Sequence, residues 1–222
     1  MFSAISSQPT APIFTQDGEY FDGFLNTKAN PVAIVDLLDK TTLKSRMVGS
    51  AYLEIEPIKN LKIKSDNGGE LVFYKVNIYE DGRMGQHYTE GGHANVMANK
   101  KKYWQTENTV TYSFDIQTKH KFDAMAGFSA SQVEYEEVTA DSKKLSEILK
   151  YYNLRGAEEH GPNSSYGVSS SLASFYGRLN YNYGDRYLAT LTMRSDGSSR
   201  FAPGHRWGFF PSLAVAWRLS EE

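Results

Sequence analysis

The chain has 222 residues, which leaves the number of domains and the fold class open. Aromatic residues make up 14% of it, with 15 Tyr and 12 Phe against 7 Pro, and this composition favours pleated strands over a helical bundle or a disordered chain. The 24 basic and 26 acidic side chains nearly cancel, so charge gives no indication of nucleic acid as a partner. Cysteine is absent, which excludes disulfides, thiolate metal sites and a cysteine nucleophile.

The mean hydropathy is negative, and no stretch approaches the roughly 18 to 20 continuous apolar residues of a membrane helix. A membrane-spanning barrel strand needs only about 10 residues and alternates apolar with polar side chains, so its mean hydropathy is unremarkable. Alternation, rather than hydropathy, is therefore the property to follow along this chain.

The first 40 residues contain turn signals such as Asp17-Gly18 and little periodicity. We expect residues 1–40 to be an extracellular-type loop segment that leads into a barrel region at 41–222. Alternation predicts strands at 47–56, 61–79, 100–117 and 122–131, and Gly68-Gly69 predicts a bulge or bend within the second of them.

The strongest alternation lies in three strands predicted at 175–183, 186–194 and 209–218. One face of these strands is apolar and is expected to meet lipid; it carries Phe175, Leu179, Tyr181, Leu191, Leu213, Val215 and Trp217. The opposite face is expected to line a polar lumen; it carries Arg178, Asn180, Asn182, Thr190, Thr192, Arg194, Ser212 and Arg218.

The predicted connections alternate in length. Short links fall at 57–60, 118–120 and 184–185, long ones at 80–98 and 138–167, and a medium one at 196–205. Tight periplasmic turns and extended extracellular loops produce this pattern in outer-membrane barrels. Inside the second long link, Leu145, Ile148, Leu149 and Tyr152 follow helical spacing and predict a short amphipathic helix.

The predicted fold class is therefore all-β: a partial antiparallel up-and-down transmembrane barrel of about seven strands. The first residues carry no secretory signal, so we expect an internal piece of a longer precursor. A soluble carbohydrate-binding β-sandwich is an alternative, because its core would also produce one apolar face per strand. Tyr181, Tyr183, Tyr187 and Trp217 lie near strand ends, as in an interfacial girdle, and favour the membrane interpretation.

One hairpin carries a family resemblance. Residues 185–201 read DRYLATLTMRSDGSSRF, 206–212 read RWGFFPS and 216–222 read AWRLSEE. These segments strongly resemble the SusC/RagA family of TonB-linked outer-membrane proteins. Weaker similarities follow the same order at 30–33, 51–54, 126–130 and 175–181. The motif residues, expected to be structural, are Arg194, Asp196, Gly197, Arg200, Arg206, Trp207, Gly208 and Pro211.

The resemblance implies part of a TonB-dependent importer in the bacterial outer membrane, with a multi-pass barrel, an internal plug, no enzymatic activity and no cofactor. It also implies a SusD-like surface lipoprotein, the TonB complex and outer-membrane lipid as partners, and an oligosaccharide or a similar nutrient, a glycan or a peptide, as cargo. This chain would supply barrel wall and extracellular loops. A passive porin would share the alternation and stays open as an alternative.

Few residues suggest chemistry. His87, Glu90 and His93 lie close in sequence, but their spacing fits no common metal motif, and we expect a polar loop. Lys100-Lys101-Lys102 is expected at the extracellular rim, as a solvated edge or a contact for lipopolysaccharide phosphates. Arg194, Asp196 and Arg200 are expected to pair and brace strand ends. Possible substrate or partner contacts in or beside the loops are Tyr79, His87, Tyr88, Tyr151 and Tyr166.

Overall fold

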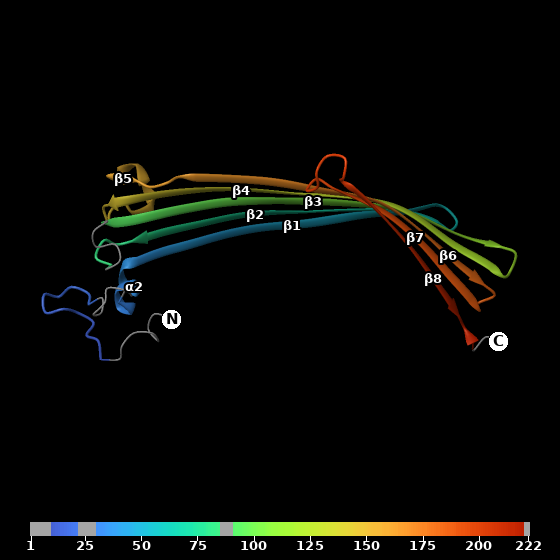
Figure 1. Ribbon diagram of the computed structural model, residues 1–222, viewed down its shortest axis with the longest axis horizontal. Helices are drawn as coiled ribbons and strands as arrows, with labels where there is room; N and C mark the ends of the chain where they lie inside the picture. The colour runs from blue at the N-terminus through green and yellow to red at the C-terminus, as the bar shows by residue number, and fades with distance from the viewer. Residues whose placement is uncertain (1–9, 22–29, 85–90, 220–222) are drawn as a thin grey trace. The chain divides into compact units, whose positions relative to one another are not determined.

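Seven long strands and one short strand make up a single antiparallel sheet (Figure 1). The computed structural model describes residues 10–21, 30–84 and 91–219. The elements are α2 (Pro31–Leu37), β1 (Leu38–Ile58), β2 (Leu61–Glu80), β3 (Gly92–Ile116), β4 (His120–Leu145), η2 (Lys150–Tyr152), η3 (Leu154–Gly156), β5 (Glu159–His160), β6 (Ser164–Tyr183), β7 (Tyr187–Ser198) and β8 (Trp207–Trp217). The hydrogen-bonded order is β1-β2-β3-β4-β6-β7-β8, with β5 paired to β4. Consecutive long strands are thus neighbours, which confirms the predicted up-and-down sheet.

The strands are longer than alternation predicted. β1, β2, β3, β4 and β6 have 20 to 26 residues, whereas β7 and β8 have 12 and 11, close to the roughly 9 to 11 that cross a bilayer. The predicted long links at 80–98 and 138–167 were therefore drawn too wide, since β3 begins at Gly92 and β4 continues to Leu145. In β4 beyond residue 131, polar side chains on both faces remove the period-2 signal although the ladder hydrogen bonds continue.

The predicted amphipathic helix around residues 145–152 is wrong. Leu145 ends β4, and single 3-10 turns follow at Lys150–Tyr152 and Leu154–Gly156. Ile148 and Tyr152, expected on the apolar side, are 90% and 80% exposed. The four residues with helical spacing cannot form one helix because the first of them, Leu145, belongs to β4.

A helix lies in the segment expected to be loop. Asn30 caps α2 by accepting a hydrogen bond from Val32 N at 2.9 Å, and Pro31 occupies the first turn, where its missing N–H costs nothing. The Asn30 amide also donates to the carbonyls of Ile13 (2.8 Å) and Phe21 (3.0 Å), so it fixes residues 13–21 to the start of α2. Among the described residues, no helix is long and apolar enough to cross a membrane.

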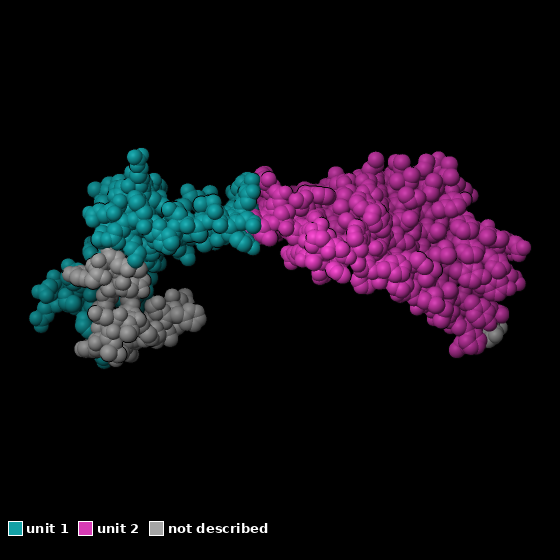
Figure 2. Space-filling model, turned by 45° about the horizontal axis from the view of Figure 1, so that its top comes forward, with its two compact units in different colours: residues 1–45, 73–100, 136–167 teal, residues 46–72, 101–135, 168–222 magenta. Residues whose placement is uncertain are grey.

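The chain divides into two compact units, each built from several strand segments (Figure 2). Unit 1 contains residues 1–45, 73–100 and 136–167, and unit 2 contains residues 46–72, 101–135 and 168–222. Unit 1 has a small core of Tyr79, Ala94 and Leu145, on which residues of the 3-10 turns pack. Every apolar residue classed as buried among the described residues belongs to unit 1.

The register of β6, β7 and β8 sorts their side chains onto two faces of unit 2. Leu179 pairs with Leu191 and Leu191 with Leu213, while the neighbouring row joins Arg178, Thr192 and Ser212. Partners across a ladder lie on the same face. The predicted segregation into an apolar and a polar face is therefore confirmed for the paired residues; Arg218 lies just beyond the end of β8.

Short turns join β1 to β2, β3 to β4 and β6 to β7, as predicted. In the last of these, Gly184 and Asp185 both have positive φ, +55° and +59°, and Arg186 N donates to Tyr183 O at 3.1 Å. Positive φ at both central positions is the geometry that suits the right-handed twist of a hairpin. Glycine and aspartate are among the residues that adopt it at low cost.

Candidate functional site

The apolar face of β6, β7 and β8 is uncovered. Leu213 and Val215 are 71% and 78% exposed, and the aromatic Phe175 and Trp217 are more than half exposed. A soluble protein seldom leaves a contiguous apolar face of this kind without a partner. The uncovered face therefore requires a covering apolar medium or a second surface. We call it the apolar wall, defined by Phe175, Leu179, Tyr181, Leu191, Leu213, Val215 and Trp217.

Aromatic rings form rows across the strands at two levels of this wall. Phe128, Phe175 and Trp207 form one row, with ring centroids 5.0 and 5.9 Å apart. Near the short turns, Tyr187 lies between Tyr183 and Trp217, at 6.3 Å from each. Rings that are far apart in sequence are thus aligned by strand register.

The distance between these rows agrees with a bilayer. Trp207 and Trp217 are ten residues apart on β8. At about 3.3 Å per residue they are roughly 33 Å apart along the strand, and a tilt of about 40° reduces the height to roughly 25 Å. Outer-membrane barrels carry an apolar band about 25 Å tall between aromatic girdles.

The opposite face of the same strands is polar and hydrogen-bonded. Ser113 Oγ donates to Asp123 Oδ2 at 2.8 Å, Asn180 Nδ2 donates to Asp123 Oδ1 at 3.3 Å, and Thr190 Oγ1 donates to Asn180 Oδ1 at 2.9 Å. This network joins β3, β4, β6 and β7. Such a face suits a water-filled or plugged interior.

Charged side chains occur on both faces of unit 2 beyond the first aromatic row. Glu70 accepts from Arg46 Nε at 2.5 Å and Lys101 Nζ at 3.1 Å, and Lys102 Nζ lies 3.5 Å from Glu134. Adjacent strand residues such as Lys101 and Lys102 point to opposite faces. This level is therefore unsuited to hydrocarbon. Because the lysines are already paired with carboxylates, the arrangement favours the solvated-edge interpretation over phosphate binding.

The motif hairpin contains an ion pair along β7 and a ring that packs on a glycine of the neighbouring strand. Arg194 Nε donates to both Asp196 oxygens, at 2.7 and 2.9 Å, and Arg194 Nη2 donates to Ser174 on β6 at 3.1 Å. Gly197 pairs with Trp207, and a Cβ at Gly197 would lie 2.8 to 2.9 Å from the indole. Only glycine leaves room for that ring.

The other motif residues have separate roles. Arg200 Nη2 donates to Ser170 at 3.4 Å, so the predicted pairing of Arg200 with Asp196 is wrong. Arg206 Nε donates to the carbonyl of Phe201 at 3.3 Å and closes the loop between β7 and β8. Gly208 leaves space for the ring of Phe210, and Pro211 pairs with Met193 within the β7–β8 ladder.

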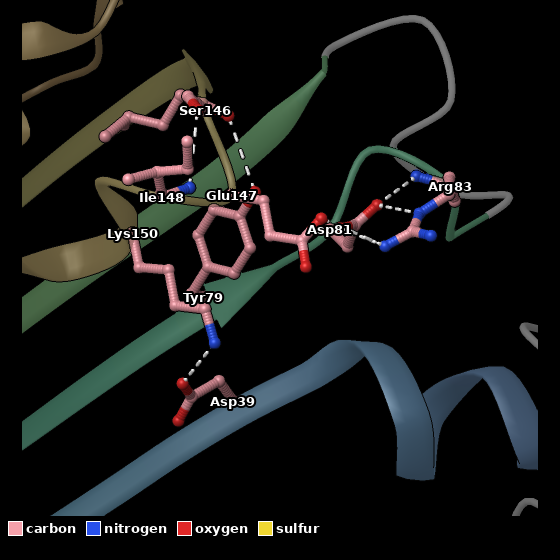
Figure 3. Close-up of polar contacts among 9 residues, drawn as sticks. Asp39, Tyr79, Asp81, Arg83, Ser146, Glu147, Ile148 and Lys150 are labelled. Carbon is pink, nitrogen blue, oxygen red and sulfur yellow. Dashed lines mark hydrogen bonds and ion pairs between the residues drawn. The ribbon is translucent and has the colours of Figure 1, made fainter.

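Unit 1 contains a polar pocket of about 380 Å³ at the loop ends of the strands. Arg83 donates to both carboxylate oxygens of Asp81, at 2.8 and 2.9 Å, and Arg83 Nη2 also reaches Glu147 at 3.3 Å (Figure 3). The bidentate bond from Arg83 holds the pKa of Asp81 below its ordinary value. The pocket is lined by Asp36, Leu37, Leu38, Asp39, Lys40, Tyr79, Asp81, Arg83, Glu147 and Lys150.

A second ion pair in this pocket joins segments distant in sequence. Lys150 Nζ donates to Asp39 Oδ2 at 2.9 Å, and Tyr151 OH donates to Asp39 Oδ1 at 3.1 Å. The hydrogen bond from Lys150 lowers the pKa of Asp39, and the same bond raises the pKa of Lys150. The loop after β4 is thus fastened to the start of β1. We call residues 146–157 the latch loop.

The residues predicted as loop contacts differ in exposure and in what they touch. Tyr79 is only 3% exposed and Lys150 Nζ lies 5.9 Å from its ring centroid, so its ring is packed inside unit 1 and is not open to the substrate or partner contact predicted there. Burial raises the pKa of Tyr79 to about 12. Tyr151 donates a hydrogen bond to Asp39 and so helps to hold the latch loop, whereas Tyr166 on β6 is 59% exposed. His87 and Tyr88 lie outside the described residues.

The metal hypothesis is not tested as a whole, because His87 and Glu90 also lie outside the described residues. His93 Nε2 is 2.8 Å from Asp141 Oδ2, and His93 Nδ1 is 3.4 Å from Glu80 Oε2. These contacts make His93 a link between β2, β3 and β4 in unit 1.

Sequence reasoning did not find the pocket. Asp39 and Lys150 are 111 residues apart, and neither belongs to a motif. The only signal was the presence of both charge signs at the loop boundaries, which is common on any solvated surface. The strand order places β2 and β3 between β1 and β4, and the pairing is made by the loop after β4, which carries Lys150 to Asp39.

Comparison with known proteins agrees with this geometry. The family model described as "TonB dependent receptor-like, beta-barrel" matches residues 15–222. TonB-dependent receptor P26 of Formosa agariphila is 33% identical over 99% of this chain and 23% of its own length. TonB-dependent receptor SusC of Bacteroides thetaiotaomicron is 28% identical over 99% of this chain and 24% of its own length.

Solved structures share the fold. The RagAB peptide importer in the closed-closed state aligns with a TM-score of 0.77 and 20% identity, over 90% of this chain and 23% of the matched one. The RagAB peptide transporter aligns with a TM-score of 0.75 and 22% identity, over 81% of this chain. The chain spans about a quarter of the length of these relatives. With its unclosed antiparallel sheet and its two-faced strands, this chain belongs to the TonB-dependent receptor-like β-barrel family.

Proposed function

We propose that the chain forms part of the wall and extracellular loops of a TonB-dependent importer in the bacterial outer membrane. The observation that carries this proposal is the exposed apolar wall between aromatic rows that lie ten residues apart on β8, backed by a hydrogen-bonded polar face. Each face suits one medium, lipid outside and a polar lumen inside. The wall is a scaffold, and no reaction is assigned to it.

The lengths of the connections define an orientation within this proposal. The short turns face the periplasm, and the longer connections face the outside of the cell, as in outer-membrane barrels. A SusD-like lipoprotein would meet that outer end, and the TonB complex would act on parts of the protein not represented by these strands. Names of relatives support this assignment, since one is SusC and others are RagAB peptide importers.

The cargo is proposed to be an oligosaccharide or a similar nutrient such as a peptide. The pocket of unit 1 offers carboxylates and cations rather than an open aromatic platform, so it suits a polar or charged group. Tyr166 stays a proposed contact because its ring is exposed. His87 and Tyr88 stay proposed contacts from sequence alone.

The soluble β-sandwich is disfavoured because its apolar face would have to be covered by a second sheet. The strands of the described residues belong to one sheet, and Leu213 and Val215 are exposed in it. A passive porin would share the wall, so the wall does not separate the two transport mechanisms. The family model and the motif hairpin favour the TonB-dependent one.

Two experiments test the proposal. The purified chain is refolded in buffer and in detergent micelles and followed by circular dichroism and sedimentation; a cooperative soluble monomer in buffer would contradict the membrane wall. The receptor gene is then deleted in its host, and uptake of labelled oligosaccharides and oligopeptides is measured with and without TonB. Uptake is expected to be lost when either the receptor gene or TonB is removed. Uptake that depends on the receptor but survives the loss of TonB would support the porin instead.

A further inference from the structure

The polar pocket of unit 1 contains hydrogen-bonding groups that its own ion pairs leave unused. Arg83 directs Nε and Nη2 at Asp81, and Nη2 also at Glu147 (Figure 3). Within the described part of the chain, Arg83 Nη1 makes no hydrogen bond, and the Glu147 carboxylate accepts only the one from Arg83, at 3.3 Å. In the same part of the chain, Asp36 accepts a hydrogen bond from the neutral hydroxyl of Tyr20 at 2.9 Å and forms no ion pair. The pocket therefore presents an unused donor and a weakly bonded acceptor side by side.

Negative charge exceeds positive charge in this pocket. Arg83 and Lys150 are the cations whose charged groups contact its carboxylates. Lys40 also lines the pocket, but it follows Asp39 on β1, so its side chain is directed to the opposite face of the strand. Four carboxylates line the pocket, those of Asp36, Asp39, Asp81 and Glu147. A cationic group that entered the pocket would reduce the repulsion between these carboxylates.

We propose that the pocket binds a primary ammonium group that has an oxygen acceptor on the neighbouring carbon. Glu147 accepts a hydrogen bond from the ammonium, and Arg83 Nη1 donates one to the oxygen. Because Glu147 and Arg83 lie side by side, both parts of such a ligand are bound together. The N-terminus of a peptide has this chemistry, with its first carbonyl beside the ammonium, and so has a 2-amino sugar, with a hydroxyl beside it. This inference rests on the proposed import function, because it names the chemistry of the cargo.

The pocket fits other ligand classes less well. A neutral sugar would leave the repulsion between the carboxylates unchanged, and an anionic group would add to it. Among the described residues, no group of three or more acidic or histidine side chains is placed to hold a metal ion. The volume of about 380 Å³ is at the lower end of the range for small-molecule sites, so it suits the terminal unit of a cargo rather than a whole oligomer.

The test is calorimetric titration of the intact receptor, purified in mild detergent, with two pairs of probes. Trialanine is compared with N-acetyl-trialanine, and a glucosamine trimer with an N-acetylglucosamine trimer, so that each pair differs in the ammonium. The free amine of at least one pair should bind about 3- to 10-fold more tightly than its acetylated form.

Two glutamates of unit 1 provide matched variants. Glu147 and Glu136 have side chains that are 67% and 66% exposed, and each lies near one cation, at 3.3 and 3.7 Å. Glu136 does not line the pocket. Glu147→Gln should reduce the preference for the free amine to about 1- to 2-fold, whereas Glu136→Gln should leave it unchanged. A preference shown by the peptide pair identifies a peptide terminus as the source of the ammonium, and one shown by the sugar pair identifies an amino sugar.

Equal binding of the free and acetylated forms in both pairs, or equal loss of preference in both glutamine variants, would overturn the proposal. Folding of each variant is measured separately by heat-modifiable gel mobility. Carbodiimide coupling of a labelled free-amine probe gives a readout on the unmodified receptor, and an amide is expected at Glu147 but not at Glu136. Labelling spread evenly over exposed carboxylates would contradict a site. A receptor that still imports its cargo in a TonB-dependent way, but shows no preference for an ammonium, would refute this inference and leave the proposed transport function intact.

Discussion

Arginine substitutions at Leu213 and Ser212 give a direct test of which face of the sheet meets lipid. The two residues are adjacent on β8, both are exposed, and they lie at nearly the same depth on opposite faces. Leu213 pairs with Leu191 on the apolar wall, whereas Ser212 pairs with Thr192 on the polar face. Each residue is therefore the matched control of the other.

The expected magnitude follows from the depth of Leu213. It is four residues from Trp217 and six from Trp207, which places it roughly 10 to 15 Å from each aromatic row once strand tilt is included. This is close to the middle of the apolar band, where an arginine facing lipid costs about 2–4 kcal/mol. Such a cost reduces the folded-to-unfolded ratio by a factor of roughly 30 to 1,000. Ser212→Arg should change the free energy of unfolding by about 0.5 kcal/mol or less.

The assay is equilibrium unfolding in denaturant of the intact receptor folded into phospholipid vesicles. Tryptophan fluorescence reports the transition, and heat-modifiable gel mobility reports the folded barrel. Equal destabilisation by both substitutions would mean that the two faces meet similar media. A larger effect at Ser212 would reverse the assignment of lipid and lumen, and with it the basis of the proposed function.

Three further outcomes are expected. Gly197→Ala should destabilise the hairpin by about 1–3 kcal/mol, because its Cβ would overlap the indole packed on it, and Gly177→Ala, where the nearest atom is 3.6 Å away, should cost less; thermal unfolding separates them. Leu145→Ala should remove about 2–5 kcal/mol of local stability from the core of unit 1, and undiminished hydrogen-exchange protection of residues 146–157 would contradict that role. Since Lys150 lowers the pKa of Asp39, the latch should be intact at neutral pH and weaken as the pH falls below about 3.8 through the pKa of the folded state. Asp39→Asn should expose the latch loop to exchange already at pH 7, and loss of exchange protection with rising acidity should be absent in that variant.

The sequence by itself determined the two faces of β6, β7 and β8. Alternating side chains such as Leu179 and Arg178 encode a face because a strand has a period of two, and the aromatic residues at strand ends marked the interfaces. The turn at Gly184-Asp185 could also be predicted from the sequence, since few residues adopt positive φ at low cost. These features depend on local geometry, so they were visible without a structure.

Only the tertiary structure decided the lengths of the strands and the contacts at their ends. The outer part of β4 has polar side chains on both faces, so no hydropathy pattern marks it as a strand although its backbone hydrogen bonds are made. The link from Lys150 to Asp39, and the fit of Trp207 over Gly197, depend on which strands are neighbours and on their register. Register is a relation between distant segments, so it cannot be read directly from a single sequence.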